Sequence, residues 1–227
     1  MITSRRLRAL CLPLAPRPIL PVVLVMIAGV IIVRAKPTGF VEVGGTTGAA
    51  PGRLVGVFEG VPLVISLALT LALAPRLPQW DRFGTTKTRR LAVAVAVAVP
   101  VISCGYFLLC LASYPSWGDP PAHVLRPVMN NVAAAGLLAV ITVGTLGRLG
   151  GTVAWVITMY AAMWAPTHWP STGRWIPLNL TRPAGAALDL SIHWGGLLVL
   201  TAAALATAFI RRLVPIEMTI RPAEERQ

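Results

Sequence analysis

Long runs of apolar residues, separated by short polar segments, dominate the pattern of this chain. A helix needs about 20 predominantly apolar residues to cross the roughly 30 Å of hydrocarbon in a bilayer. The pattern therefore predicts an all-α integral membrane protein with about six transmembrane helices. The transmembrane domain is expected over residues 18–210, with spans at about residues 18–33, 54–74, 91–112, 127–146, 152–166 and 187–210.

The first and fifth predicted spans are shorter than the usual length of about 17 to 25 residues. Snorkelling of Arg17 and Arg34, or local thinning of the bilayer, is needed to accommodate the first. The pattern is consistent with four to six spans. Residues 91–99 alternate Leu or Val with Ala, as a strand does, but the apolar run continues to Ala112 and its length favours a helix.

The distribution of basic residues predicts the orientation of the chain. Fourteen of the 20 Lys and Arg residues fall in segments on one side of the predicted spans, and six fall on the other side. Because cytoplasmic loops carry an excess of Lys and Arg, the richer side is expected in the cytoplasm, together with both termini. High usage of Ala, Val, Gly, Pro and Arg is typical of a GC-rich bacterial genome, so we expect the inner or plasma membrane of a bacterial cell.

The two terminal segments are expected outside the bilayer core. Residues 1–17 place leucines at helical spacing among Arg5, Arg6 and Arg8, which predicts a basic amphipathic helix on the inner leaflet with anionic lipid as its partner. No small-x-small cleavage site follows the first apolar run, which favours a retained span over a cleaved signal peptide. Residues 211–227 are expected to form a cytoplasmic tail.

Composition excludes a water-soluble globular domain for the bulk of the chain. Hydrophobic residues make up 56% of the sequence and charged residues 12%, whereas soluble domains carry about a quarter charged residues. The formal net charge of +12 would suggest nucleic acid in a soluble protein. Here the basic residues lie between apolar runs, without an aromatic-interleaved patch, so they indicate lipid headgroups and no nucleic-acid partner.

Few ionisable residues lie inside the predicted spans, and these are candidate functional groups. A charge at the centre of a span costs about 2.5 to 3.5 kcal/mol on insertion scales. Glu59 lies near the outer end of the second span, and Asp189 opens the sixth, with His193 one turn later. Two interpretations are open: solvation at the interface or pairing with Arg53 or Arg182, and a substrate or proton site.

Motifs for nucleotide binding, metal binding and nucleophilic catalysis were sought and not found. The spacings of the three histidines match no metal motif, and the three cysteines include no CxxC pair. We therefore predict no catalytic residues, no metal, no cofactor and no enzymatic activity of the chain itself. Asn130 and Asn131 are interpreted as hydrogen-bonding groups in helix packing.

Residues 75–90 form the longest polar stretch between spans on the predicted cytoplasmic side. A short helix there would carry one apolar ridge with charged residues beside it, an arrangement typical of a protein-binding hot spot. The residues concerned are Leu77, Trp80, Asp81, Arg82 and Phe83.

This layout resembles the membrane subunit of ABC-type exporters in the type-two permease class. The similar features are the basic N-terminal helix, six spans with both ends inside, the charged segment at residues 75–90, and an outer segment rich in aromatic residues and proline before the last span. The resemblance implies that residues 75–90 couple to a separate cytoplasmic ATPase subunit. It also implies that a second permease subunit, the same chain or a sister chain, completes the pathway for a drug, peptide or lipid-like substrate.

Other functions remain open on the sequence. A small secondary transporter would show related halves and helices broken near the middle of the membrane. Comparison of residues 18–112 with residues 127–210 shows no convincing repeat. A non-transporting membrane scaffold or a membrane enzyme is the remaining alternative.

Overall fold

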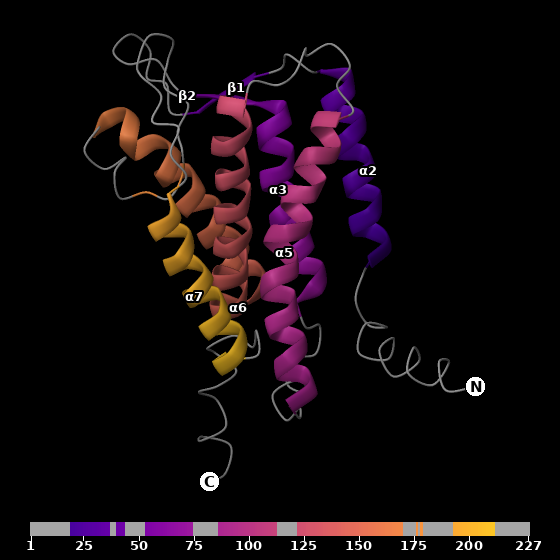
Figure 1. Ribbon diagram of the computed structural model, residues 1–227, viewed down its shortest axis with the longest axis vertical. Coiled ribbons are helices and arrows are strands. Elements are labelled where there is room, and N and C mark those ends of the chain that lie inside the picture. Colours follow the sequence, from indigo (N-terminus) through magenta and orange to yellow (C-terminus); the bar gives the residue numbers. More distant parts are fainter. Residues whose placement is uncertain are drawn as a thin grey trace.

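The computed structural model describes residues 19–36, 40–43, 53–74, 86–112, 122–169, 176, 178 and 193–211. These residues form an all-α bundle with one short antiparallel hairpin (Figure 1). Its five helices are α2 (Ile19–Ala35), α3 (Val57–Leu73), α5 (Thr86–Ala112), α6 (Ala122–His168) and α7 (Trp194–Arg211). Its two strands are β1 (Phe40–Val43) and β2 (Arg53–Gly56).

The prediction of six transmembrane helices is wrong in number. Among the described residues, two helices are long and apolar enough to cross a bilayer, α5 over Thr88–Ala112 and α6 over Leu125–Ala165. Helices α2 and α3 have 17 residues each and α7 has 18, so at about 1.5 Å per residue each is about 26 Å long. The predicted fourth and fifth spans correspond to the two parts of α6 on either side of Gly147, where the backbone is not helical.

The β hairpin is a second correction, because residues 54–56 were expected to begin a helix. Leu54 pairs with Glu42 and Val55 with Val41, so these apolar residues belong to β2 and α3 starts only at Val57. Hydrophobic period and the length of the apolar run could not predict strand β2, because a short apolar run that continues directly into a helix has the same pattern as the helix itself.

Helix α6 reverses direction at Gly147, where φ is 78° and ψ is −173°. Only glycine adopts this region of backbone conformation without strain. The two arms, residues 122–146 and 148–168, then fold against each other, as Figure 1 shows. A side chain at Gly151 would lie 2.7 Å from the carbonyl oxygen of Thr142, so glycine is also required where the arms meet.

The described part of the chain begins and ends at the same end of the bundle. In Figure 1, α2 begins, α3 ends, α5 begins and α7 ends at the lower end, and the turn of α6 lies there as well. The β hairpin lies at the opposite, upper end. The start of the first described helix and the end of the last therefore lie on one side of the bundle.

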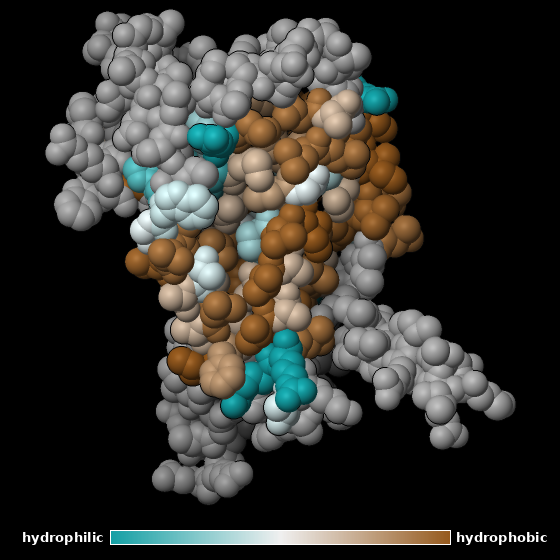
Figure 2. All heavy atoms as spheres, viewed as in Figure 1, coloured by the Kyte–Doolittle hydropathy of each residue, from teal (hydrophilic) through white to brown (hydrophobic). Residues whose placement is uncertain are grey.

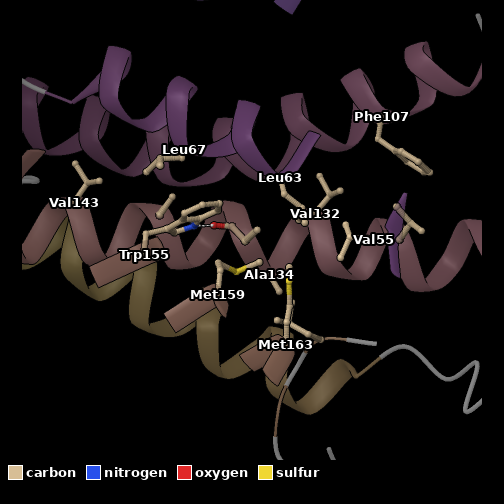
Figure 3. Packing of buried hydrophobic residues seen from close by; sticks show 14 of the residues in the cluster. Val55, Leu63, Leu67, Phe107, Val132, Ala134, Val143, Trp155, Met159 and Met163 are labelled. Atoms are coloured by element: carbon tan, nitrogen blue, oxygen red, sulfur yellow. Dashed lines mark hydrogen bonds between the residues drawn. The ribbon is translucent and has the colours of Figure 1, made fainter. Parts of the chain in front are cut away.

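Helices α3 and α6 form the centre of the core: α3 packs against α2, α5 and α6, and α6 also packs against α5 and α7. Leu63 and Leu67 of α3 face the Trp155 and Met159 side chains of the second α6 arm (Figure 3). Helix α2 lies at the edge and is attached by Tyr106 of α5, whose hydroxyl donates a 2.8 Å hydrogen bond to the carbonyl oxygen of Met26.

The outer surface of the bundle is apolar. Figure 2 shows a face on which most described side chains are hydrophobic, with hydrophilic groups mainly near the upper and lower ends. Exposed large apolar side chains occur on α2, α5, both arms of α6 and α7; the most exposed include Leu20, Ile31, Val101, Leu109, Leu149, Ile157, Leu198 and Ile210. This surface is the reverse of the polar covering that a water-soluble bundle needs.

Candidate functional site

Glu59 is a buried carboxylate in the described part of the chain. It is the third residue of α3, after the extended N-cap residue Gly56, and its side chain is only 2% exposed. The first turn of a helix carries unsatisfied N–H groups and a partial positive charge, which stabilise a carboxylate there. The sequence therefore positions this group through the start of α3.

Asn131, from the first arm of α6, holds the Glu59 carboxylate. Its Nδ2 donates a 2.8 Å hydrogen bond to Glu59 Oε1, and the Asn131 side chain is itself buried. A hydrogen bond to a charged group contributes about 1.5 to 3 kcal/mol, which offsets part of the cost of burying the carboxylate. Asn130, the neighbouring amide, is buried as well.

A second polar contact joins the same two helices at the lower end. Arg148 Nη2 donates a 3.0 Å hydrogen bond to the carbonyl oxygen of Ala74, the C-cap residue of α3. The two contacts join residues separated by 72 and 74 positions in the sequence. Because Arg148 comes directly after the turn that ends the first arm of α6, the two contacts show that α3 and this first arm run parallel to each other.

Buried hydroxyls lie between these two contacts. Glu59, Ser66 and Thr70 share one face of α3, and Asn131 and Thr142 share one face of α6, because their spacings follow the helical repeat. Each of the three hydroxyls donates to a carbonyl of its own helix three or four residues earlier. We call this group the α3–α6 seam; it comprises Glu59, Ser66, Thr70, Asn131 and Thr142.

The structure changes the interpretation of Glu59. The carboxylate is buried rather than solvated at an interface. Of its two suggested arginine partners, Arg182 lies outside the described residues and nothing is described of the Arg53 side chain. The prediction that Asn131 acts as a hydrogen-bonding group in helix packing is confirmed.

The other predicted site residues are not brought to this seam in the described part of the chain. Asp189 lies outside the described residues, and so do the predicted ATPase-coupling residues Leu77, Trp80, Asp81, Arg82 and Phe83. Helix α3, which precedes the coupling residues, ends at the lower end of the bundle, and α5, which follows them, begins there (Figure 1). His193 precedes α7, and its carbonyl oxygen accepts a 2.9 Å hydrogen bond from the Leu197 amide.

The described residues offer few groups for metal binding or thiol chemistry. That part of the chain contains no group of three or more His, Cys, Asp or Glu side chains placed to hold a metal ion. Cys104 and Cys110 are free thiols. Cys110 is buried in the core, and the Cys104 Sγ lies 3.7 Å from the Met129 carbonyl oxygen.

Sequence reasoning missed the contact between Arg148 and Ala74. A signal was present, since Arg148 is the single basic residue between two apolar stretches and has Gly147, Gly150 and Gly151 around it. Such a cluster of glycines with one cation is consistent with a helix turn that needs a donor for carbonyls at a helix end.

Comparisons with protein-family models, with characterised proteins and with solved structures gave no match to this chain. Its function is therefore inferred from the chemistry and placement of its own residues.

Proposed function

We propose that this protein is a multi-pass helical subunit of a bacterial cell membrane that acts as the permease of an ATP-driven transporter. In this proposal a separate cytoplasmic ATPase subunit binds and hydrolyses ATP. A second permease subunit, identical or a sister chain, completes the pathway for a drug, peptide or lipid-like substrate. The observation that carries the proposal is the distribution of polarity, with apolar side chains outside and the Glu59–Asn131 pair inside.

The apolar exterior supports insertion into a bilayer. Leu198 and Ile210 of α7 are 68% and 75% exposed, and α2 exposes large aliphatic residues along most of its length. Leaving such side chains in water costs about 25 cal/mol for each Å² of apolar surface, whereas lipid chains accept them without that cost. Helix α5, with 27 residues, is about 40 Å long and exceeds the roughly 30 Å of hydrocarbon.

The α3–α6 seam supports the idea that a movement on the cytoplasmic side is transmitted to the interior of the bundle. The proposed ATPase-coupling segment, residues 75–90, directly follows Ala74, the C-cap residue of α3 whose carbonyl oxygen accepts the hydrogen bond from Arg148. A displacement of that segment would act on the end of α3 and, through Arg148, on the turn of α6. Because α3 and the first α6 arm are parallel, both elements can carry the displacement to Glu59 and Asn131 at the other end.

Glu59 also favours a second candidate, a small secondary transporter. A buried carboxylate in a membrane bundle is a typical group for binding a proton or a cation. Such transporters break their helices near the middle of the membrane, whereas α6 breaks at Gly147, level with the end of α3. The position of the break favours the permease.

Purification from native bacterial membranes in mild detergent tests the proposal. The wild-type chain is expected in the membrane fraction, with a soluble ATPase that co-purifies and hydrolyses ATP. Trp80→Ala combined with Phe83→Ala should leave membrane insertion intact and abolish ATPase recovery, because an aromatic hot-spot residue contributes about 2 kcal/mol or more to binding.

The matched control is Trp194→Ala, which removes an exposed tryptophan at the start of α7 and should leave ATPase recovery unchanged. Recovery of the ATPase with the double variant at the wild-type yield would contradict the coupling role. Absence of any ATPase from the wild-type preparation would refute the permease. Ion-gradient-dependent transport by the purified chain without ATP would then establish the secondary transporter.

A further inference from the structure

Arg89 of α5 is held against Phe209 of α7 at the lower end of the bundle. Its guanidinium carbon lies 4.6 Å from the centroid of the Phe209 ring. Phe209 is half exposed, and Arg89 is partly buried. Among the described residues, the Arg89 guanidinium makes this ring contact and no ion pair, and its enclosed Nε has no hydrogen-bond acceptor. The cation is therefore positioned by the ring and is not neutralised by a carboxylate in that part of the chain.

The position of Arg89 along α5 corresponds to a lipid headgroup layer. The uninterrupted apolar stretch of α5 starts at Leu91, directly after Arg89 and the exposed Arg90. Helix α5 is longer than the hydrocarbon is thick, so its first turns extend into the headgroups. Figure 2 shows a hydrophilic group at the lower end of α5, immediately below the apolar surface.

Among the described residues at the start of α5, the charged side chains are all basic. The first turn of α5 contains no acidic residue, and its N–H groups add the partial positive charge of a helix start. Arginine binds phosphate through parallel N–H donors, and the ring stack limits the orientations of the Arg89 guanidinium. Both helices carry exposed apolar side chains: Ile210 directly follows Phe209 on α7, and Val97 lies about two turns after Arg89 on α5.

We propose that Arg89, Arg90 and Phe209 form a binding site for an anionic phospholipid of the inner leaflet. The two guanidinium groups bind the headgroup phosphate, and the acyl chains lie along the exposed apolar side chains of α5 and α7. A phospholipid fits this site because its phosphate can pair with the arginine side chains while its two acyl chains cover the apolar surface of α5 and α7. This inference rests on the membrane location in the proposed function and is independent of the ATPase.

Native mass spectrometry of the full chain, purified from membranes, tests the site with phosphatidylglycerol and phosphatidylcholine as probes. The wild type is expected to retain phosphatidylglycerol preferentially. Arg89→Gln should weaken phosphatidylglycerol binding about fivefold, the effect of one basic side chain near the membrane surface. Phe209→Leu keeps both arginines and should weaken it about twofold or more, because the guanidinium loses its aromatic support.

Arg34→Gln is the matched control, since Arg34 is exposed in the last turn of α2 at the opposite end of the bundle. It should leave the phosphatidylglycerol affinity unchanged. Equal affinity of the wild type for both lipids, an equal loss in Arg34→Gln, or an unchanged Phe209→Leu would each overturn the site. Recovery of the wild type in the soluble fraction would instead refute the membrane location on which the proposed function depends.

Discussion

The indole nitrogen of Trp155 donates a 2.9 Å hydrogen bond to the carbonyl oxygen of Ala135, twenty residues earlier in the same helix. The two residues meet because α6 reverses at Gly147 and brings its second arm back along the first. Trp155 is buried against α3, with Leu67 beside it (Figure 3). This single side chain thus joins both arms of α6 to the central helix.

Removing the indole N–H should loosen the α6 arms. Trp155→Phe keeps an aromatic ring but loses the donor and part of the buried area, so we expect a loss of about 1 to 3 kcal/mol in stability. Thermal unfolding in detergent should show a melting temperature lower by several degrees. Trp194→Phe changes an exposed ring and should not alter the melting temperature. Equal melting temperatures for Trp155→Phe and wild type would show that the contact does not hold the arms.

The turn at Gly147 should reject any side chain. Gly147→Ala forces a residue with a Cβ into a positive-φ conformation, which costs about 1 to 3 kcal/mol. Gly105→Ala is a control with the opposite expected sign. Gly105 lies inside α5 with open space around it, and alanine is favoured over glycine in a helix by about 1 kcal/mol. A similar melting temperature for the two variants would contradict the reversal at Gly147.

The Glu59–Asn131 contact should show strong energetic coupling. Asn131→Leu removes the donor from a buried carboxylate and should cost about 1.5 to 3 kcal/mol. Glu59→Leu combined with Asn131→Leu should cost less than the sum of the two single changes, because neither polar group is then left without the other. A double-mutant cycle by thermal unfolding measures this coupling. If the loss of unfolding free energy in the double variant equals the sum of the losses in the two single variants, the two side chains are not energetically coupled.

Arg148 should affect coupling rather than ATPase binding. Under the proposed function, Arg148→Gln weakens the link between the end of α3 and the turn of α6. The ATPase should co-purify at the wild-type yield, while transport-dependent ATP hydrolysis falls severalfold. Arg126→Gln, at the start of the first α6 arm, is the control and should retain wild-type hydrolysis. Loss of ATPase binding in Arg148→Gln would place this residue in the docking surface instead.

Cysteine labelling in intact cells tests the orientation predicted from the basic residues. In a chain with its native cysteines replaced by serine, new cysteines at Gly45 and Ser171 should react with an impermeant reagent from outside. A cysteine at Thr85 should react only after the membrane is permeabilised. Labelling at Thr85 in intact cells would reverse the proposed orientation.

Local sequence pattern is sufficient to predict that the described chain is mainly helical and where most of its helices lie. Apolar run length is a local property, so the stretches predicted at 54–74 and 91–112 correspond to α3 and α5 with shifts of a few residues. The buried amide of Asn131 was also predictable, because a polar group within an apolar helix needs a hydrogen-bonding partner in the bundle.

Other features of the fold depend on contacts between residues that are distant in the sequence. The reversal of α6 depends on the positive φ of Gly147, and a glycine in an apolar run is equally compatible with simple helix packing. The pairing of residues 54–56 with β1 and the burial of Glu59 by Asn131 depend on partners distant in the sequence. Which helix faces meet is a non-local property that hydrophobic period and charge do not encode. The number of spans and the surroundings of Glu59 therefore required the structure.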